Sequence, residues 1–295
     1  MEKVCRFCIA DFHVEIVFQG DGANSLRLIP SFEPFRVNDK ATQPLFRLIV
    51  DDDLSPFPKA RRERIREFDT GNGLTVVDRL DQGGYQYIIR NLDGADCCLL
   101  ITNNDFSECR CALNGNYNMR CFGLNNALML AFAFASSRQQ CLLIHASLVR
   151  QEGYGYAFVA KSGTGKSTHT QLWKKRFGER AVFINDDKPL LKISAQGVTV
   201  YGTPWDGKHH RSTNTSCPLK AVCILTRNTE NSIQRIDKKA ALPMLCQQSY
   251  RPCSPIGAQK TLALVDRLGS SVPLYRLGCN MEPEAALVAY HGMNQ

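Results

Sequence analysis

Apolar and polar residues alternate along much of the first 120 residues, a pattern typical of half-buried β-strands. The clearest alternating segments are residues 12–18, 45–50, 74–77 and 85–89. The pairs Gly83-Gly84, Asp93-Gly94 and Asn114-Gly115 have the residue types of tight hairpin turns. We therefore predict a β-rich N-terminal domain over residues 1–122.

The pattern changes from alternation to helical spacing after this region. Leu124, Leu128, Phe132 and Ala135 recur about one turn apart, which predicts a helix over residues 125–140. We place the domain boundary just before this helix, so that the second domain spans residues 123–295.

The second domain alternates apolar strands with amphipathic helices, the order typical of an α/β fold. We expect strands over residues 142–149, 154–160, 181–185, 190–193, 198–201, 219–225 and 272–277. We expect helices over residues 167–177, 240–249, 259–268 and 283–291. The short connection at Gln196-Gly197 predicts an antiparallel pair, so the sheet is expected to be mixed.

Composition narrows the class of protein. The 295 residues carry a formal charge of +8 that is spread along the chain, which suits a protein that handles phosphates. No recognition-helix or zinc-finger pattern appears, so we expect no nucleic-acid partner. The longest apolar run, residues 127–135, is too short to span a bilayer. We expect no membrane contact.

The cysteines bear on the compartment. The chain has 13 of them, and residues 1–18 alternate in polarity rather than forming a secretory leader. We therefore expect free thiols and a cytoplasmic protein. An alternative is a zinc site, should the Cys5–Cys8 and Cys109–Cys111 pairs meet in space.

Residues 160–167, Ala-Lys-Ser-Gly-Thr-Gly-Lys-Ser, carry the main functional signal. They match the phosphate-loop pattern G-x-x-x-x-G-K-[ST] except that Ala160 replaces the first glycine. Gly163 and Gly165 let backbone amides turn toward phosphates, and Lys166 reaches the β- and γ-phosphates. The alternative, a glycine-rich turn without a ligand, is disfavoured because an apolar strand precedes the loop and a helix follows it.

The loop predicts a nucleotide site and its ligand. We expect ATP, or another nucleoside triphosphate, with Mg²⁺. The predicted nucleotide-binding residues are Ala160, Lys161, Ser162, Gly163, Thr164, Gly165, Lys166, Ser167 and Thr168.

Two carboxylates follow a short apolar strand about twenty residues after Lys166. Asn185-Asp186-Asp187 lies where nucleotide enzymes place a metal-ligating Asp beside the loop. Two adjacent carboxylates at the end of a buried strand are unfavourable unless a cation or a proton pairs with them. The alternative is a helix cap or a turn at the end of the strand.

His145 is a third candidate, because of a register argument. If Glu152-Gly153 forms a two-residue hairpin turn, Gln151 faces Tyr154, and counting outward places His145 opposite Ala160. The imidazole would then lie at the mouth of the loop. The alternative is a buried core histidine.

These three elements resemble the catalytic domain of HPr kinase/phosphorylase, and the related nucleotide site of ATP-dependent phosphoenolpyruvate carboxykinase. That family shows a strand ending in Leu-His, a hairpin, a phosphate loop, a helix and a strand ending in Asp-Asp. The equivalents here are Ile144-His145, residues 160–167 and Asp186-Asp187. The resemblance is strong over residues 142–192 and absent from residues 1–120. It implies a P-loop kinase core with a mixed sheet behind a β-rich N-terminal domain.

The resemblance also implies roles for the site residues. Asp186 would take the proton from a serine-type hydroxyl. Asp187 and Ser167 would hold magnesium, Lys166 would neutralise the γ-phosphoryl group, and His145 would lie beside the reacting phosphate. Phosphoryl transfer depends mainly on positioning and charge neutralisation, which such a set can supply.

The stretch after the Asp pair departs from the HPr kinase signature. Residues 201–208 read Tyr-Gly-Thr-Pro-Trp-Asp-Gly-Lys, followed by His209, His210 and Arg211. The stretch resembles HPr-kinase-like proteins found beside peptide-modification genes. Lys208 and Arg211 are candidate phosphate contacts, and the alternative is a plain connecting loop. We expect the two histidines to point apart and not to form a site.

The favoured function is an ATP-dependent kinase that moves the γ-phosphate to a hydroxyl on a protein, a peptide or a small metabolite. One alternative is a non-catalytic nucleotide-binding sensor whose N-terminal domain binds a partner. The other is a carboxykinase-type enzyme, which would need Arg and Lys clusters for a dicarboxylate. Residues 1–122 would dock the acceptor or serve assembly, and the sequence leaves homo-oligomer formation open.

Overall fold

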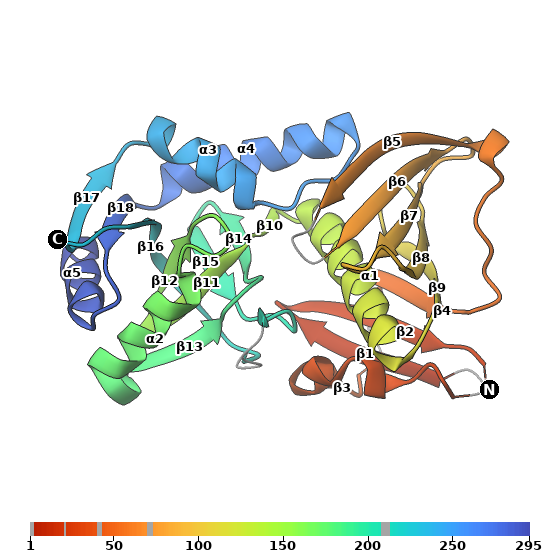
Figure 1. Ribbon diagram of the computed structural model, residues 1–295, viewed down its shortest axis with the longest axis horizontal. Coiled ribbons are helices and arrows are strands. Elements are labelled where there is room, and N and C mark those ends of the chain that lie inside the picture. The colour runs from red at the N-terminus through yellow and green to blue at the C-terminus, as the bar shows by residue number, and fades with distance from the viewer. Residues whose placement is uncertain (1–2, 21, 40–42, 70–72, 208–212) are drawn as a thin grey trace. The chain divides into compact units, whose positions relative to one another are not determined.

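The structure is a computed structural model that describes residues 3–20, 22–39, 43–69, 73–207 and 213–295 (Figure 1). The chain divides into two compact units, Met1–Ser136 and Ser137–Gln295. Each unit has its own mixed β-sheet, so the predicted α/β class with mixed sheets is confirmed.

The first unit is built on a sheet in the order β3-β1-β2-β4-β9-β8-β7-β6-β5. Its strands are β1 (Lys3–Ile9), β2 (Phe12–Phe18), β3 (Arg36–Val37), β4 (Phe46–Val50), β5 (Arg62–Asp69), β6 (Leu74–Leu80), β7 (Tyr85–Arg90), β8 (Asp96–Thr102) and β9 (Glu108–Leu113). β4 pairs in parallel with β2 and with β9, whereas the other neighbours are antiparallel. The sequence pattern predicted β2, β4, β6 and β7 but not β1, β3, β5, β8 and β9.

The helix α1 (Tyr117–Ser137) belongs to the first unit, although the sequence placed the boundary before it. Phe132 and Phe134 of α1 pack against Phe12 and Phe106, with ring centroids 6.4 Å and 5.1 Å apart. A Cβ added at Gly123 would lie 2.6 Å from the Cys97 carbonyl oxygen. The helix therefore lies directly on the sheet of the first unit, and its apolar stripe serves that core.

Two of the three predicted hairpin turns are confirmed. Gly83-Gly84 joins β6 to β7, and Asp93-Gly94 lies between β7 and β8. Asn114-Gly115 was wrong as a hairpin, because α1 follows it instead of a strand. The Asn116 side chain accepts a hydrogen bond from the Met119 amide at 3.1 Å, which is an N-cap contact that starts the helix eight residues before the predicted 125.

The second unit has a sheet in the order β10-β14-β15-β16-β12-β11-β13, with β18 on β16 and β17 on β18. Its strands are β10 (Cys141–Leu143), β11 (Ala146–Gln151), β12 (Tyr154–Val159), β13 (Ala181–Asn185), β14 (Leu190–Ser194), β15 (Gly197–Tyr201), β16 (Ser216–Arg227), β17 (Ser232–Ile236) and β18 (Leu274–Cys279). β16 pairs in parallel with β12 and with β18. The long strand β16 is antiparallel to β15 at its start.

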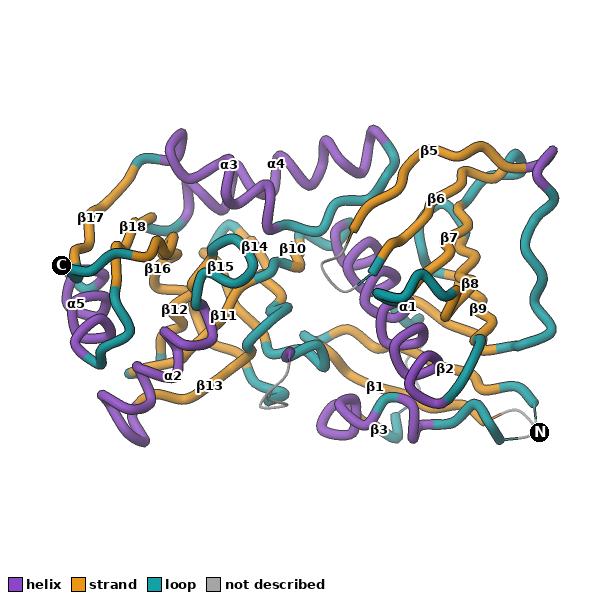
Figure 2. Tube along the Cα trace, viewed as in Figure 1, coloured by secondary structure: helices purple, strands orange, loops and turns teal. Residues whose placement is uncertain are grey.

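Helices cover the strands of the second unit from two sides (Figures 1 and 2). They are α2 (Lys166–Phe177), α3 (Lys238–Gln248), α4 (Pro255–Ser271) and α5 (Glu284–Met293). One core cluster contains apolar side chains of α3 and α4, and a second contains those of α2 and α5. Side chains of β11 and β12 alternate between the two clusters, as strand geometry requires. The predicted helices are all present, with boundaries that shift by a few residues.

The predicted strand 142–149 is in fact two strands, β10 and β11, separated at Ile144-His145. The amides of Ile144, His145 and Ala146 donate to carbonyl oxygens of three other residues, at 3.2, 2.8 and 3.1 Å. The acceptors are Pro189, Gln248 and Asp187, respectively. The chain therefore leaves its pairing with β14 and begins its pairing with β12 at His145. A continuous apolar run in the sequence gives no sign of this break.

The described residues contain no helix that is both long enough and apolar enough to cross a bilayer. None of the 13 cysteines forms a disulfide. Within the described part of the chain, no group of three or more His, Cys, Asp or Glu side chains is arranged to hold a metal. Cys5, Cys109 and Cys111 are instead buried in the sheet of the first unit, as small apolar side chains would be.

Trp173 is the largest fully buried side chain of the second unit, and its loss should destabilise the protein. Its ring lies 5.0–5.9 Å from those of Tyr156, Phe158, Phe177 and Tyr290, between centroids. We expect Trp173→Ala to lower the free energy of unfolding by about 3–5 kcal/mol in urea denaturation. Lys175→Ala, an exposed change on the same helix, should cost less than about 0.5 kcal/mol. Equal effects of the two changes would contradict this packing.

Candidate functional site

The hairpin of β11 and β12 leads directly into the glycine-rich loop. Gln151 pairs with Tyr154, and the ladder continues to Ala146 opposite Val159. Glu152 and Gly153 form the turn with φ of 52° and 83°, as a two-residue turn of type I′ requires. The predicted register is therefore confirmed as far as Ala146 opposite Val159, where the ladder ends. His145, predicted opposite Ala160, directly precedes this pair, and its amide bonds to Gln248 instead.

The loop has the backbone conformation that its glycines permit. Gly163 and Gly165 adopt φ of 76° and 121°, which side-chain-bearing residues rarely adopt. Ala160 does not have positive φ and is fully buried in the core, so the missing first glycine does not disturb the loop. α2 begins at Lys166, and its first amides have no acceptor within the helix. A helix N-terminus of this kind favours an anion.

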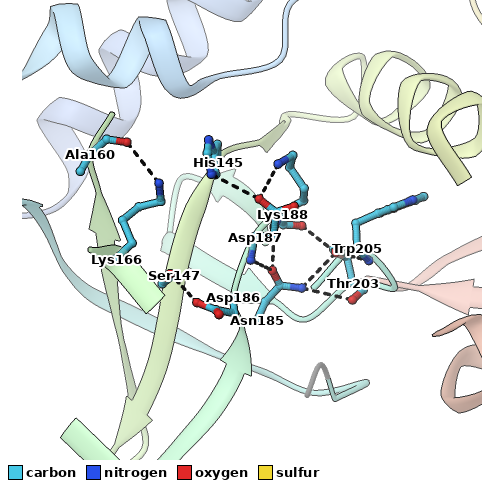
Figure 3. A network of polar contacts seen from close by, with 10 residues as sticks. All are labelled: His145, Ser147, Ala160, Lys166, Asn185, Asp186, Asp187, Lys188, Thr203 and Trp205. Atoms are coloured by element: carbon cyan, nitrogen blue, oxygen red, sulfur yellow. Dashed lines mark hydrogen bonds and ion pairs between the residues drawn. The ribbon is translucent and has the colours of Figure 1, made fainter. Parts of the chain in front are cut away.

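Lys166 is buried at the base of this loop. It is 7 % exposed, and its Nζ donates to the Ala160 carbonyl oxygen at 3.2 Å (Figure 3). Burial lowers the pKa of Lys166; Asp187 opposes this change and Lys188 adds to it. Among the described residues, no carboxylate forms an ion pair with Lys166. An anion at the loop would therefore supply the charge partner that this ammonium lacks.

Arg227 contacts the loop from the neighbouring strand. It is the last residue of β16, and its guanidinium donates to the carbonyl oxygens of Gly163 and, at 3.1 Å, of Thr164. Arg227 therefore ties the glycine-rich loop to the end of β16. The sequence pattern gave no sign of this residue.

The two aspartates follow β13 and lie beside β11 (Figure 3). The buried Ser147 hydroxyl donates to Asp186 Oδ1 at 2.6 Å, which fixes the direction of that carboxylate. Asp187 Oδ1 lies 2.5 Å from Lys188 Nζ and 3.3 Å from His145 Nε2. The predicted residues His145 and Asp187 are thus in direct contact.

Asn185 holds the turn that presents both carboxylates. Its Oδ1 accepts from the amides of Asp187 and Lys188 at 2.9 and 2.7 Å. Its Nδ2 donates to the carbonyl and hydroxyl oxygens of Thr203 at 3.1 and 3.2 Å. The Thr203 hydroxyl in turn donates to the Lys188 carbonyl oxygen at 2.6 Å. These bonds pair the Asn185 side chain, the amides of Asp187 and Lys188 and the Lys188 carbonyl oxygen within the protein.

The segment after β15 supports this turn and is more than a plain connection. Thr203, Trp205 and Asp206 are buried. A Cβ added at Gly207, where φ is 70°, would lie 3.3 Å from the Asp187 Cβ. Lys208, His209, His210 and Arg211 lie outside the described residues, so the predicted phosphate contacts of Lys208 and Arg211 stay predictions.

His145 is neutral near pH 7. Burial lowers its pKa to about 4; Lys188 and Lys166 act in the same direction, and Asp187 opposes them. Its contact with Asp187 is therefore one between an imidazole and a carboxylate rather than an ion pair. A neutral imidazole can donate or accept a hydrogen bond beside a phosphate.

Lys188 is a charged member of the site that the sequence argument did not select. It is buried, and its Nζ lies 5.7 Å from the centroid of the Tyr250 ring. Burial alone would lower the pKa of Lys188, but Tyr250 and Asp187 outweigh it and raise the pKa. The only signal in the sequence was its position directly after the Asp pair.

The oxygen donors here fit magnesium chemically. Ser167 and Asp187 supply a hydroxyl and a carboxylate, and Mg²⁺ prefers a few such ligands together with phosphate oxygens and water. The described residues offer no cluster of three or more His, Cys, Asp or Glu that would hold a metal alone. Ser167 and Asp187 do not contact each other directly, so substrate phosphates would have to complete the ligand set.

Comparison with known proteins identifies the family. The family model of SynChlorMet cassette protein ScmC matches residues 109–282, which is more than half of the chain, and the chain therefore belongs to this family. No curated protein matches. The HPr(Ser) kinase/phosphatase from Coxiella burnetii is similar in structure, with 11 % identity and a TM-score of 0.32 over 52 % of this chain and 88 % of that chain.

The Thr203 hydroxyl should be needed for the stability of the turn. We expect Thr203→Val to lower the free energy of unfolding by about 2–3 kcal/mol, because it leaves buried polar groups of Asn185 and Lys188 unpaired. Thr203→Ser keeps the hydroxyl and should cost about 1 kcal/mol for the lost methyl group. Urea denaturation of both variants checks this. Equal losses would mean that the hydroxyl contributes nothing.

Proposed function

We propose that the chain is an ATP- and magnesium-dependent phosphotransferase that moves the γ-phosphate to a hydroxyl. The P-loop core of the HPr kinase type, the cytoplasmic location and the serine-type acceptor on a protein or peptide are parts of this proposal. Its support is the combination of a phosphate-binding loop with a pair of carboxylates on a neighbouring strand.

The observation that carries the proposal is the buried Lys166 at the start of α2. It follows two glycines with positive φ and lies without a carboxylate partner among the described residues. A buried ammonium is unfavourable unless an anion or good hydrogen bonds compensate it. A triphosphate on the loop amides would provide that anion.

The residues divide between binding and proton transfer. Residues 160–168 would hold the triphosphate, and Ser167 and Asp187 would ligate magnesium, which neutralises phosphate charge when bound. Asp186, aligned by Ser147, would accept the proton of the attacking hydroxyl. His145 and Lys166 would lie beside the transferred group. The first unit would then dock the acceptor.

A nucleotide-binding sensor without catalysis is the second candidate. It would need the loop and Lys166 but would have no need for an aligned base. The 2.6 Å contact that orients Asp186 favours the enzyme. A carboxykinase-type reaction has less support, because the described site contains no evident set of Arg and Lys side chains for a dicarboxylate.

Binding of ATP with magnesium should depend on Lys166. We expect Lys166→Met to weaken binding about 10- to 100-fold in isothermal titration calorimetry, because a charge-assisted contact to phosphate is lost. Lys175→Met is the matched control: this exposed lysine lies on α2, beyond the residues that would hold the triphosphate, and should leave the affinity within about threefold. Absence of binding by the unmodified protein would contradict the proposal.

Turnover should depend on Asp186 while binding does not. We expect Asp186→Asn to lower ADP release in the presence of an acceptor at least about 100-fold, with little change in ATP affinity. Asp266→Asn removes a carboxylate on α4 that pairs with Lys238 at 2.7 Å and should leave the rate unchanged. Tight binding with no ADP release from the unmodified protein, with serine-containing peptides or small hydroxyl compounds as acceptors, would favour the sensor instead.

A further inference from the structure

Lys188 lies in the site, but the proposed reaction assigns it no role. Its ammonium lies 2.5 Å from Oδ1 of Asp187, the same oxygen that His145 Nε2 approaches to 3.3 Å. The Lys188 side chain is only 10 % exposed, compared with 28 % for Asp187. The cation thus lies on the buried side of the carboxylate.

The backbone of Lys188 is held by three hydrogen bonds within the site. Its amide donates to Asn185 Oδ1 at 2.7 Å and to the Trp205 carbonyl oxygen at 3.0 Å. Its own carbonyl oxygen accepts from Thr203. The Tyr250 ring lies beside the Nζ at 5.7 Å, within the range of a cation–π contact.

An ammonium and a divalent cation compete for the same carboxylate. An oxygen that accepts a short charge-assisted hydrogen bond from a lysine must give up that contact, at least in part, before a metal can bind to it. A positive charge so close also repels an approaching cation. A metal that is bound to a triphosphate arrives as part of a complex with net negative charge. The displaced ammonium can then contact a phosphate oxygen in place of Asp187.

We propose that Lys188 is the resident counter-ion of Asp187, which keeps divalent cations weakly bound until a nucleotide is present. This inference rests on the proposed function, because it assigns Asp187 to magnesium. Lys188 is then a positioning residue that couples metal binding to nucleotide binding. Lys166, which contacts Ala160 and no carboxylate, does not have this role.

The test is the affinity of nucleotide-free protein for Mn²⁺, measured by electron paramagnetic resonance. We expect Lys188→Met to bind Mn²⁺ at least about tenfold more tightly than the unmodified protein. Lys188→Arg keeps the charge and should stay close to the unmodified protein. Adding Asp187→Asn to Lys188→Met should abolish the gain. Circular dichroism checks folding, and Lys188→Gln replaces the methionine variant if that variant does not fold.

The outcomes separate this inference from the proposed function. Equal Mn²⁺ affinity in Lys188→Met and the unmodified protein would overturn the counter-ion role, even if ATP binding depends on Lys166 as expected. A gain that persists with Asp187→Asn would also overturn it. Failure of ATP to bind would instead contradict the proposed function, and the Mn²⁺ comparison would still decide whether Lys188 competes with a cation at Asp187.

Discussion

The side-chain amide of Asn185 holds the turn on which the arrangement of the site depends. It accepts from two successive backbone amides and donates to Thr203, whose hydroxyl closes the network on the Lys188 carbonyl oxygen. A buried turn with two carboxylates and a lysine would otherwise expose unpaired polar groups to an apolar core. With the turn held in this way, contacts within the protein orient both carboxylates: Ser147 bonds to Asp186, and Lys188 bonds to Asp187.

Two lysines and two aspartates face one another at the centre of the site. Lys166 and Lys188 stand against Asp186 and Asp187, and His145 is neutral because burial lowers its pKa to about 4. The pairing is uneven, however. Asp187 is bonded to Lys188, whereas Lys166 donates to a carbonyl oxygen and, within the part of the chain that the structure describes, pairs with no carboxylate. The loop lysine is therefore the point where an added anion would gain most, and Asp187 is the point where an added cation meets a competitor.

Local patterns in the sequence were sufficient for much of this unit. The register of the β11–β12 hairpin followed from two turn residues, and the glycines of the loop marked where positive φ is required. The break at His145 was not predictable, because it results from amides that bond to residues more than forty positions away, such as Pro189. The same holds for Arg227 on the loop and for Thr203 on Asn185, since both are contacts between segments distant in sequence. The early start of α1 depended on one cap, Asn116, whose residue type suits a turn as well as a helix.

The most direct measurement of the central claim is a crystal structure with Mn²⁺ and a non-hydrolysable ATP analogue, with anomalous data collected at the manganese edge. We expect the triphosphate on the amides of residues 163–168, and a manganese peak bonded to Ser167 or Asp187 and to phosphate oxygens. A nucleotide bound elsewhere, or a manganese ion with no contact to Ser167 or Asp187, would contradict it.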